Sequence, residues 1–150
     1  MPSTMPNDPE NIHELYQEII LEHNKRPRHY GALETYTDQI EGHNPLCGDK
    51  IRIYLQIDAG MLKAVSFECA ACAICKASCS MMCESLVNTG FRDYQSSIRK
   101  GLEFLDPEKA GSLVDNSDLK ALKGIHKFPA RLNCARLAWN TLKDYLRINI

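Results

Sequence analysis

Residues 51–90 read IRIYLQIDAGMLKAVSFECAACAICKASCSMMCESLVNTG, and the spacing of their apolar side chains changes partway along. Over 51–58, aliphatic residues alternate with polar residues or tyrosine, which is typical of a half-buried strand. Asp58-Ala59-Gly60 predicts a hairpin turn, and apolar side chains alternate again over 65–67 on the return strand. Alanine, methionine and leucine over 72–90 then predict a helix. The middle of the chain is therefore predicted to be a β-hairpin followed by a helix.

The flanking sequence adds further elements. Proline with an acidic neighbour starts a predicted helix at Pro9, and apolar residues at helical spacing extend it to about residue 24. An earlier strand is expected over 38–43. Residues 91–128 predict shorter helices joined by turns, and a final helix is predicted to begin near Pro129. These elements form an α+β arrangement, with a small antiparallel sheet packed by several helices.

Length and composition agree with one globular unit. The chain has 150 residues, 44% of them hydrophobic and 25% charged, with a net charge of -1. We expect a disordered tail over 1–8 and a single domain over 9–150. The near-zero charge argues against nucleic acid or an anionic membrane as a partner. The sequence has neither a secretory signal nor the roughly 20 apolar residues of a spanning helix, which predicts a soluble, cytoplasmic protein.

Cysteine is the unusual part of the composition. The chain has seven cysteines, an odd number, so a disulfide framework would leave one thiol unpaired. The reducing cytoplasm would not maintain such a framework. Metal, persulfide or cluster chemistry is the more natural use of these thiols.

Three cysteines and one acid are the candidate metal ligands. Cys47 and Asp49 flank a glycine in a predicted tight loop, where the backbone can bend so that both side chains converge. Cys72 lies at a predicted helix start, which favours a thiolate. Cys134 lies early in the final helix. Three thiolates and a carboxylate form a tetrahedral set that suits zinc, or iron with sulfide.

Arg131 precedes Cys134 by three residues on the same predicted helix face. A site of three thiolates and a carboxylate keeps a net negative charge around a dication, and a guanidinium would offset part of it. We therefore take Arg131 as a candidate functional residue. The alternative is an ordinary solvated arginine on a helix surface.

A second cysteine pattern competes with this interpretation. Cys69, Cys72, Cys75 and Cys79 have the C-x2-C-x2-C-x3-C spacing of bacterial ferredoxins, which would make the chain an electron carrier. Serine follows where that run has proline, there is no second run, and the alanines between the cysteines favour a regular helix. On such a helix Cys75, Cys79 and Cys83 share a stripe and are predicted to be core. A zinc domain in which the metal only holds the fold is a third possibility.

Several motifs resemble the NifU-like N-terminal or IscU family, most of all its SufU branch. The segments that carry the resemblance are Ile19-Ile20 through His23 to Pro27-Arg28 and Gly31; Asn44-Pro45-Leu46-Cys47-Gly48-Asp49; Cys72-Ala73-Ile74 through Ala77-Ser78 to Met81-Met82; and Arg131-Leu132-Asn133-Cys134 followed by Leu137-Ala138-Trp139. Asn133 stands where IscU-type chains have histidine. Cys75 and Cys79 stand where the family typically has serine and alanine.

The resemblance implies a three-stranded antiparallel sheet packed by helices, with a site made of Cys47, Asp49, Cys72 and Cys134. For SufU-like proteins it implies zinc-dependent sulfur transfer. By this resemblance, a pyridoxal-phosphate cysteine desulfurase would free Cys47 from zinc, and Cys47 would then accept persulfide sulfur for downstream assembly proteins. For IscU-like proteins the same ligands hold a transient [2Fe-2S] cluster, and the chain would be a scaffold without enzymatic activity.

Overall fold

A computed structural model describes the backbone of residues 9–113 and 117–148 and the side chains from residue 12 within these ranges. The tail expected over 1–8 lies outside the described residues. The elements in chain order are α1 (Pro9–Lys25), β1 (Asp38–Asn44), β2 (Asp49–Asp58), β3 (Met61–Ala70), α2 (Ala73–Asn88), α3 (Tyr94–Phe104), the 3-10 helices η1 (Ala110–Ser112), η2 (Asp118–Lys127) and η3 (Pro129–Arg131), and α4 (Leu132–Leu146).

The sheet has the order β1-β2-β3, and both strand pairs are antiparallel. Ile53 is at its centre, paired with Ile40 on one side and Phe67 on the other. The predicted α+β class and three-stranded sheet are confirmed. Some boundaries differ from the prediction. The final helix α4 begins at Leu132, after the 3-10 helix η3 at Pro129. β2 begins at Asp49, before the first alternating isoleucine. Pairing of Asp49 with Asn44 extends the ladder to the turn, so the candidate ligand is the first residue of a strand.

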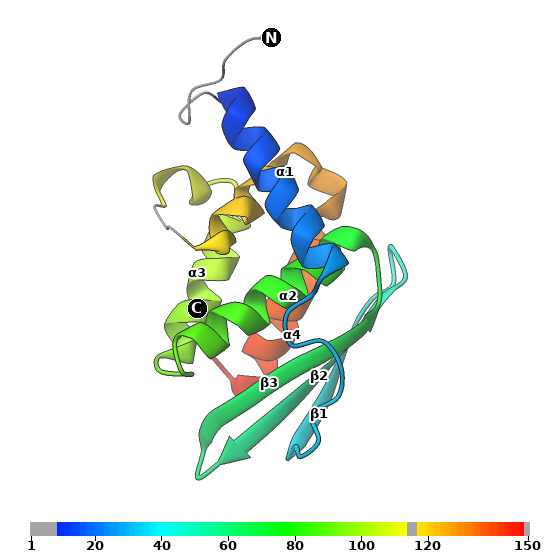
Figure 1. Cartoon of the computed structure of the whole chain (residues 1–150), viewed down its shortest axis with the longest axis vertical. Helices are drawn as coiled ribbons and strands as arrows, with labels where there is room; N and C mark the ends of the chain where they lie inside the picture. Colours follow the sequence, from blue (N-terminus) through cyan, green and yellow to red (C-terminus); the bar gives the residue numbers. More distant parts are fainter. Residues whose placement is uncertain (1–8, 114–116, 149–150) are drawn as a thin grey trace.

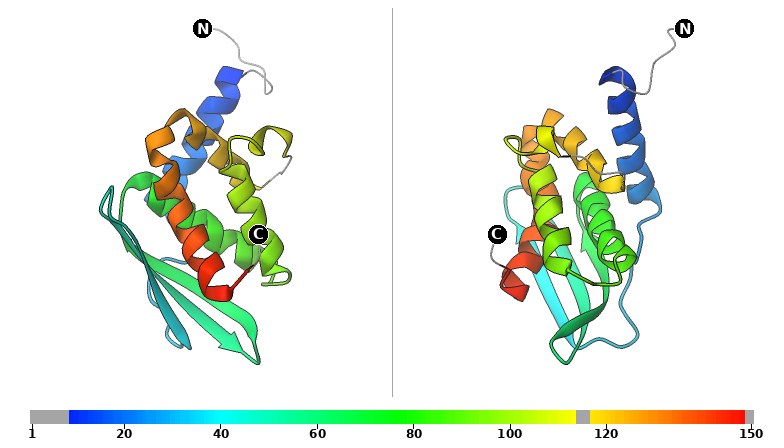
Figure 2. Two further views of the ribbon diagram at one scale, coloured as in Figure 1. Left: turned by 180° about the vertical axis from the view of Figure 1, so that it is seen from behind. Right: turned by 90° about the vertical axis from the view of Figure 1, so that its left-hand side faces the viewer.

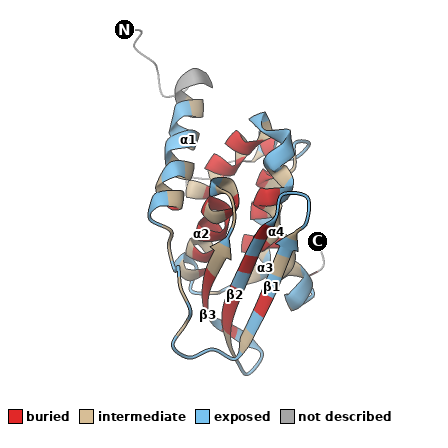
Figure 3. Ribbon diagram, turned by 90° about the vertical axis from the view of Figure 1, so that its right-hand side faces the viewer, coloured by how far each residue is buried: buried red, intermediate tan, exposed pale blue. Residues whose placement is uncertain are grey.

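All the helices lie on one side of the sheet, as Figures 1 and 2 show. α2 and α4 are adjacent to the strands, and α1, α3 and the 3-10 helices form the layer beyond them. Buried residues gather between the sheet and α2 and α4 (Figure 3). In the described ranges, no helix has the length and apolar content needed to cross a bilayer.

The two central helices are joined by a buried polar contact. The Trp139 indole N–H donates to Ser78 Oγ at 2.8 Å, and that hydroxyl donates to the carbonyl of Ala135 at 2.6 Å. Ser78 and Trp139 are both fully buried, so these bonds satisfy groups that water cannot reach. The contact holds the start of α4 against α2, and each of these helices contributes one candidate ligand.

Gly101 of α3 provides a test of this packing. A Cβ atom built there would lie 2.2 Å from Cζ3 of Trp139. Gly101→Ala should therefore lower the free energy of unfolding by about 1–3 kcal/mol, because the added methyl group overpacks the core. In an ordinary helix the same substitution would raise this free energy by ~1 kcal/mol. Urea denaturation measures this. Gly111→Ala, whose added Cβ meets nothing within 4 Å, is the control. A Gly101→Ala protein as stable as wild type would contradict the packing described here.

Candidate metal centre

The loop between β1 and β2 presents Cys47. The carbonyl of Asn44 accepts the backbone N–H of Gly48 at 2.8 Å, and Asn44 Oδ1 accepts the N–H of Leu46 at 3.1 Å. Gly48 has φ +75°, a conformation that disfavours residues with a Cβ. The tight turn directs the Cys47 thiol back toward Asp49 and leaves it exposed.

Asp49 is the residue on which the site converges. Its carboxylate is buried, and Oδ2 accepts from the Cys47 thiol at 3.1 Å and from the Cys72 thiol at 3.5 Å. Oδ1 accepts the backbone N–H of Cys72 at 2.9 Å. Burial alone would raise the pKa of Asp49, but the N–H of Cys72 and the thiols of Cys47, Cys134 and Cys72 outweigh it and lower this pKa. Asp49 is therefore held as a carboxylate, the form that binds a cation.

Cys72 is the N-cap of α2. Its sulfur accepts the backbone N–H of Cys75 at 3.4 Å, the bond that an N-cap side chain usually makes to the first helical turn. The thiol is half-buried and lies between the exposed loop and the core.

Cys134 approaches from the opposite side, in the first turn of α4. It is buried, and its sulfur lies 3.1 Å from that of Cys47. Burial, followed by contacts with Cys47 and Asp49, raises the pKa of the Cys134 thiol. A hydrogen bond with Cys134 raises the pKa of Arg131, and the negative charge of Cys72 adds to this effect. The exposed Arg131 guanidinium therefore lies at the edge of the site.

Three of the four predicted ligand residues thus meet at one end of the sheet, and Cys72 lies beside them, outside the group whose ligand atoms are all mutually close. Ligand atoms of Cys47, Asp49 and Cys134 all lie within 4.8 Å of one another, and Cys72 joins them through its contact with Asp49 Oδ2. Contacts of 3.1 to 3.5 Å are slightly shorter than the ~3.5–3.8 Å between ligands of a tetrahedral zinc ion. The donor set, three sulfurs and a carboxylate, fits zinc or iron with sulfide.

The other cysteines are placed differently. Cys75, Cys79 and Cys83 are fully buried, as predicted for a core stripe. Burial raises the pKa of the Cys83 thiol. A hydrogen bond with Cys79, together with burial, raises the pKa of the Cys75 thiol. Cys69 is half-buried at the end of β3, where burial raises its pKa to about 11. A regular helix runs through the ferredoxin-like spacing, so these cysteines do not form a loop around a cluster.

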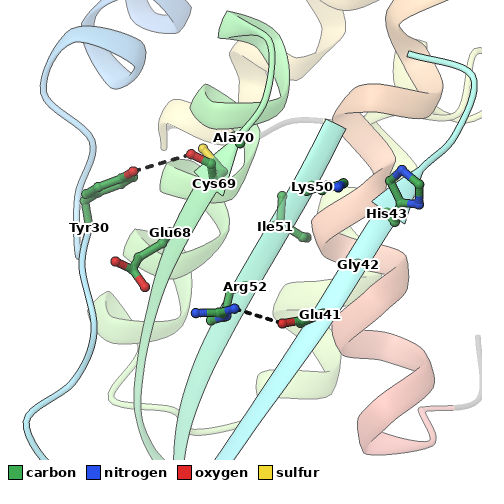
Figure 4. A pocket seen from close by; sticks show the side chains of 10 residues that line it. All are labelled: Tyr30, Glu41, Gly42, His43, Lys50, Ile51, Arg52, Glu68, Cys69 and Ala70. Carbon is green, nitrogen blue, oxygen red and sulfur yellow. Dashed lines mark hydrogen bonds and ion pairs between the residues drawn. The ribbon is translucent and has the colours of Figure 1, made fainter. Parts of the chain in front are cut away.

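A hollow of about 620 Å³ lies on the outer face of the sheet, away from α2 and α4. Figure 4 shows the side chains that line it. Cys69 and Ala70 line one edge, where the Tyr30 hydroxyl donates to the carbonyl of Cys69 at 3.5 Å. Arg52 is paired with Glu41 across its floor. None of the four predicted ligand residues lines this hollow, so it is separate from the metal centre.

Two features of the structure were not predicted from the sequence. Leu46, directly before Cys47, is 87% exposed, so an apolar side chain stands beside the exposed thiol. His23, Glu84 and Asp118 form a second group of potential metal ligands within 4.8 Å of one another. Leu46 was present in the sequence motif but had no periodicity to mark it, and the His23 group joins residues from three separate elements.

The fold and the donor set define a small α+β protein with a thiol-rich candidate metal site at one end of its sheet. Residues 15–135, most of the chain, match the family described as the NifU-like N terminal domain. The chain belongs to this family.

Two curated relatives align along nearly their whole length. The zinc-dependent sulfurtransferase SufU of Bacillus subtilis is 32% identical over 133 residues, which cover 89% of this chain and 90% of that protein. The iron–sulfur cluster assembly scaffold protein IscU of Thermotoga maritima is 33% identical over 136 residues, covering 89% and 93%. Both a sulfurtransferase and a scaffold are thus similar to this chain.

Solved structures agree with the fold. A protein of Fervidobacterium islandicum, described as a cluster assembly scaffold for the SUF system, superimposes with a TM-score of 0.72 at 27% identity, covering 89% of this chain and 98% of that one. The N-terminal part of a NifU-like protein from Brucella abortus has the same fold, with a TM-score of 0.72 at 24% identity.

Proposed function

We propose that this chain is an iron–sulfur cluster assembly protein that accepts persulfide sulfur on Cys47. The observation that carries the proposal is the placement of Cys47: of the seven cysteines, all within the described ranges, it is the exposed one, yet its sulfur contacts both Asp49 and Cys134. The Cys47 thiol can therefore be approached by a partner protein and also belongs to the candidate donor set. The similarity to SufU and IscU supports the same role.

The transfer itself is a thiol exchange. The Cys47 thiolate attacks the outer sulfur of a desulfurase persulfide, a new S–S bond forms on Cys47, and the desulfurase thiolate leaves. No net oxidation or reduction takes place, because one persulfide replaces another. The Cys47 loop has an exposed tip, which suits approach to a second protein. Its partners would be a pyridoxal-phosphate cysteine desulfurase and, downstream, other cluster assembly proteins in the cytoplasm.

Cys47, Asp49, Cys72 and Cys134 would hold zinc in the resting protein. Bound zinc keeps coordinating thiols deprotonated. Arg131 lies where it can offset the excess negative charge of three thiolates and a carboxylate. Arg131 would also attract a partner's persulfide anion to Cys47.

The same donor set would suit a transient [2Fe-2S] cluster, and the similarity to IscU favours that second candidate. Metal and acid-labile sulfide analysis after anaerobic purification distinguishes the two. About one zinc per chain without sulfide is expected for the sulfur acceptor. Iron with an equal amount of sulfide would instead assign the scaffold function.

Substitutions test the ligand set. Asp49→Ala, Cys72→Ala and Cys134→Ala should each lose the bound metal, whereas Cys79→Ala should retain it because Cys79 is core. The chain should also stimulate turnover of its desulfurase. Unchanged desulfurase turnover by a fully zinc-loaded chain would overturn the proposal and leave a zinc domain with a structural role.

A further inference from the structure

Cys72 and Cys75 form a C-x-x-C pair at the N-terminus of α2. Cys72 is the half-buried N-cap and Cys75 lies in the first turn, fully buried. The backbone N–H of Cys75 donates to the sulfur of Cys72 at 3.4 Å, and the carbonyl of Cys72 accepts the N–H of Lys76 at 3.0 Å. A more accessible thiol at a helix N-terminus, followed three residues later by a buried one, is the arrangement found in dithiol redox proteins.

The spacing permits a disulfide without unwinding the helix. Residues three apart on a helix have Cα atoms about 5 Å apart, inside the roughly 4.4–6.8 Å range of disulfides. Cys75 has no place in the proposed ligand set, and it lies one helical turn from Cys72. The pair is therefore a potential source of two electrons beside that site.

The pair also lies next to Cys47. The sulfurs of Cys47 and Cys72 contact the same oxygen, Asp49 Oδ2, at 3.1 and 3.5 Å. A persulfide on Cys47 extends its reach by one S–S bond of about 2 Å. Asp49 therefore holds Cys72 within reach of a sulfur atom carried by Cys47.

We propose that Cys72 and Cys75 reduce the persulfide on Cys47 and release its outer sulfur as hydrosulfide, an activity that rests on the proposed function. The Cys72 thiolate attacks the outer sulfur, which forms a Cys72 persulfide and frees the Cys47 thiolate. Cys75 then attacks the inner sulfur of that persulfide. The Cys72–Cys75 disulfide forms, hydrosulfide leaves with the two electrons, and the Cys75 proton goes to solvent. A dithiol reductant restores the pair.

Holding a metal and reducing a persulfide are mutually exclusive uses of Cys72, because one sulfur cannot be a metal ligand and a disulfide partner at once. The chain can therefore carry out this reaction only while Cys72 is not bound to a metal ion. Added zinc is expected to slow hydrosulfide release at least tenfold and to leave the persulfide on Cys47.

The test uses full-length chain treated with a chelator and a desulfurase carrying a sulfur-35 persulfide, freed of cysteine by gel filtration. No small-molecule thiol is added to the reaction. Wild type is expected to release one labelled hydrosulfide for each Cys72–Cys75 disulfide formed. Cys75→Ser and Cys75→Ala should keep the label on the chain, as a persulfide on Cys47 or Cys72, and release at least tenfold less hydrosulfide. Cys83→Ser, equally buried two turns further along α2, is the control and should behave as wild type.

Mass spectrometry locates the disulfide. Cys69, Cys72 and Cys75 share the tryptic peptide 64–76, so fragmentation of that peptide and the Cys69→Ser variant separate the possible pairs. A disulfide joining Cys47 to Cys134, or Cys69 to Cys72, would overturn the assignment. Label retained equally on wild type and Cys75→Ser would overturn this inference and leave the proposed function standing. If no variant carries label on Cys47 or Cys72 and none releases labelled hydrosulfide, both this inference and the proposed function would be defeated.

Discussion

Replacing Cys47 with alanine is expected to lower sulfur transfer from a desulfurase to this chain by roughly 100-fold or more, because the substitution removes the nucleophile. The other thiols cannot substitute efficiently for it. Cys134 is buried behind Cys47, and Cys72 is half-buried beneath the loop. The bound metal should be lost with the activity, since a donor atom has been removed. Transfer of sulfur-35 and elemental analysis of the same preparation measure both effects.

Cys83→Ala is the matched control for that experiment. It also removes one thiol, but from a fully buried position two turns or more beyond Cys75 on α2. The variant should keep its bound metal and its sulfur-transfer activity, with at most a modest loss of stability because the substitution leaves a small cavity. A Cys47→Ala protein that accepts sulfur at half the wild-type rate would show that another residue is the acceptor.

The second large effect is expected at His23, which is fully buried and joins three elements. Its Nδ1 is 2.7 Å from Ser80 Oγ on α2, and its Nε2 is 2.8 Å from Asp118 Oδ2 at the start of η2. His23→Ala should lower the free energy of unfolding by about 3–5 kcal/mol, through a cavity and the loss of partners for buried polar groups. Against a typical total of about 5–15 kcal/mol, this is a severe loss.

Urea denaturation in the presence of a chelator measures this effect, since bound metal would otherwise change the apparent stability. His43→Ala is the control: His43 is exposed on β1, and its removal should change the stability by less than ~0.5 kcal/mol. His23→Asn keeps a side chain that can still pair with one of the polar groups. Its free energy of unfolding should therefore fall less than that of His23→Ala. A loss below ~1 kcal/mol in His23→Ala would mean that this buried network contributes little to folding.

Local sequence patterns were enough to predict most of the fold. Alternation over 51–58 predicted β2, and the hairpin turn predicted its pairing with β3. The helical stripe of Cys75, Cys79 and Cys83 correctly predicted buried positions. Strand alternation and the helical stripe both depend on which residues of one short segment share a face. The spacing of apolar residues along the sequence indicates this directly. The start of β2 was missed because Asp49 has no place in an apolar alternation.

The candidate site was predicted in part. Residue types and motifs selected Cys47, Asp49, Cys72 and Cys134 from the sequence. That the thiols of Cys47 and Cys72 share one carboxylate oxygen of Asp49 could not be derived from it. Nothing in the sequence predicted that Asp49 would also accept the backbone N–H of Cys72. The partners of His23 were equally hidden, since they lie 57 and 95 residues away along the chain.

The sequence by itself determined most of the secondary structure, the fold class and the residue types of the candidate site, because strand alternation, helix capping and ligand type are properties of short segments. Only the tertiary structure decided which thiols share an environment. The sulfurs of Cys47 and Cys134 are 87 residues apart along the chain and 3.1 Å apart in space. That contact depends on how α4 packs against α2 and the sheet, and such packing is a sum of many long-range contacts that no single segment encodes.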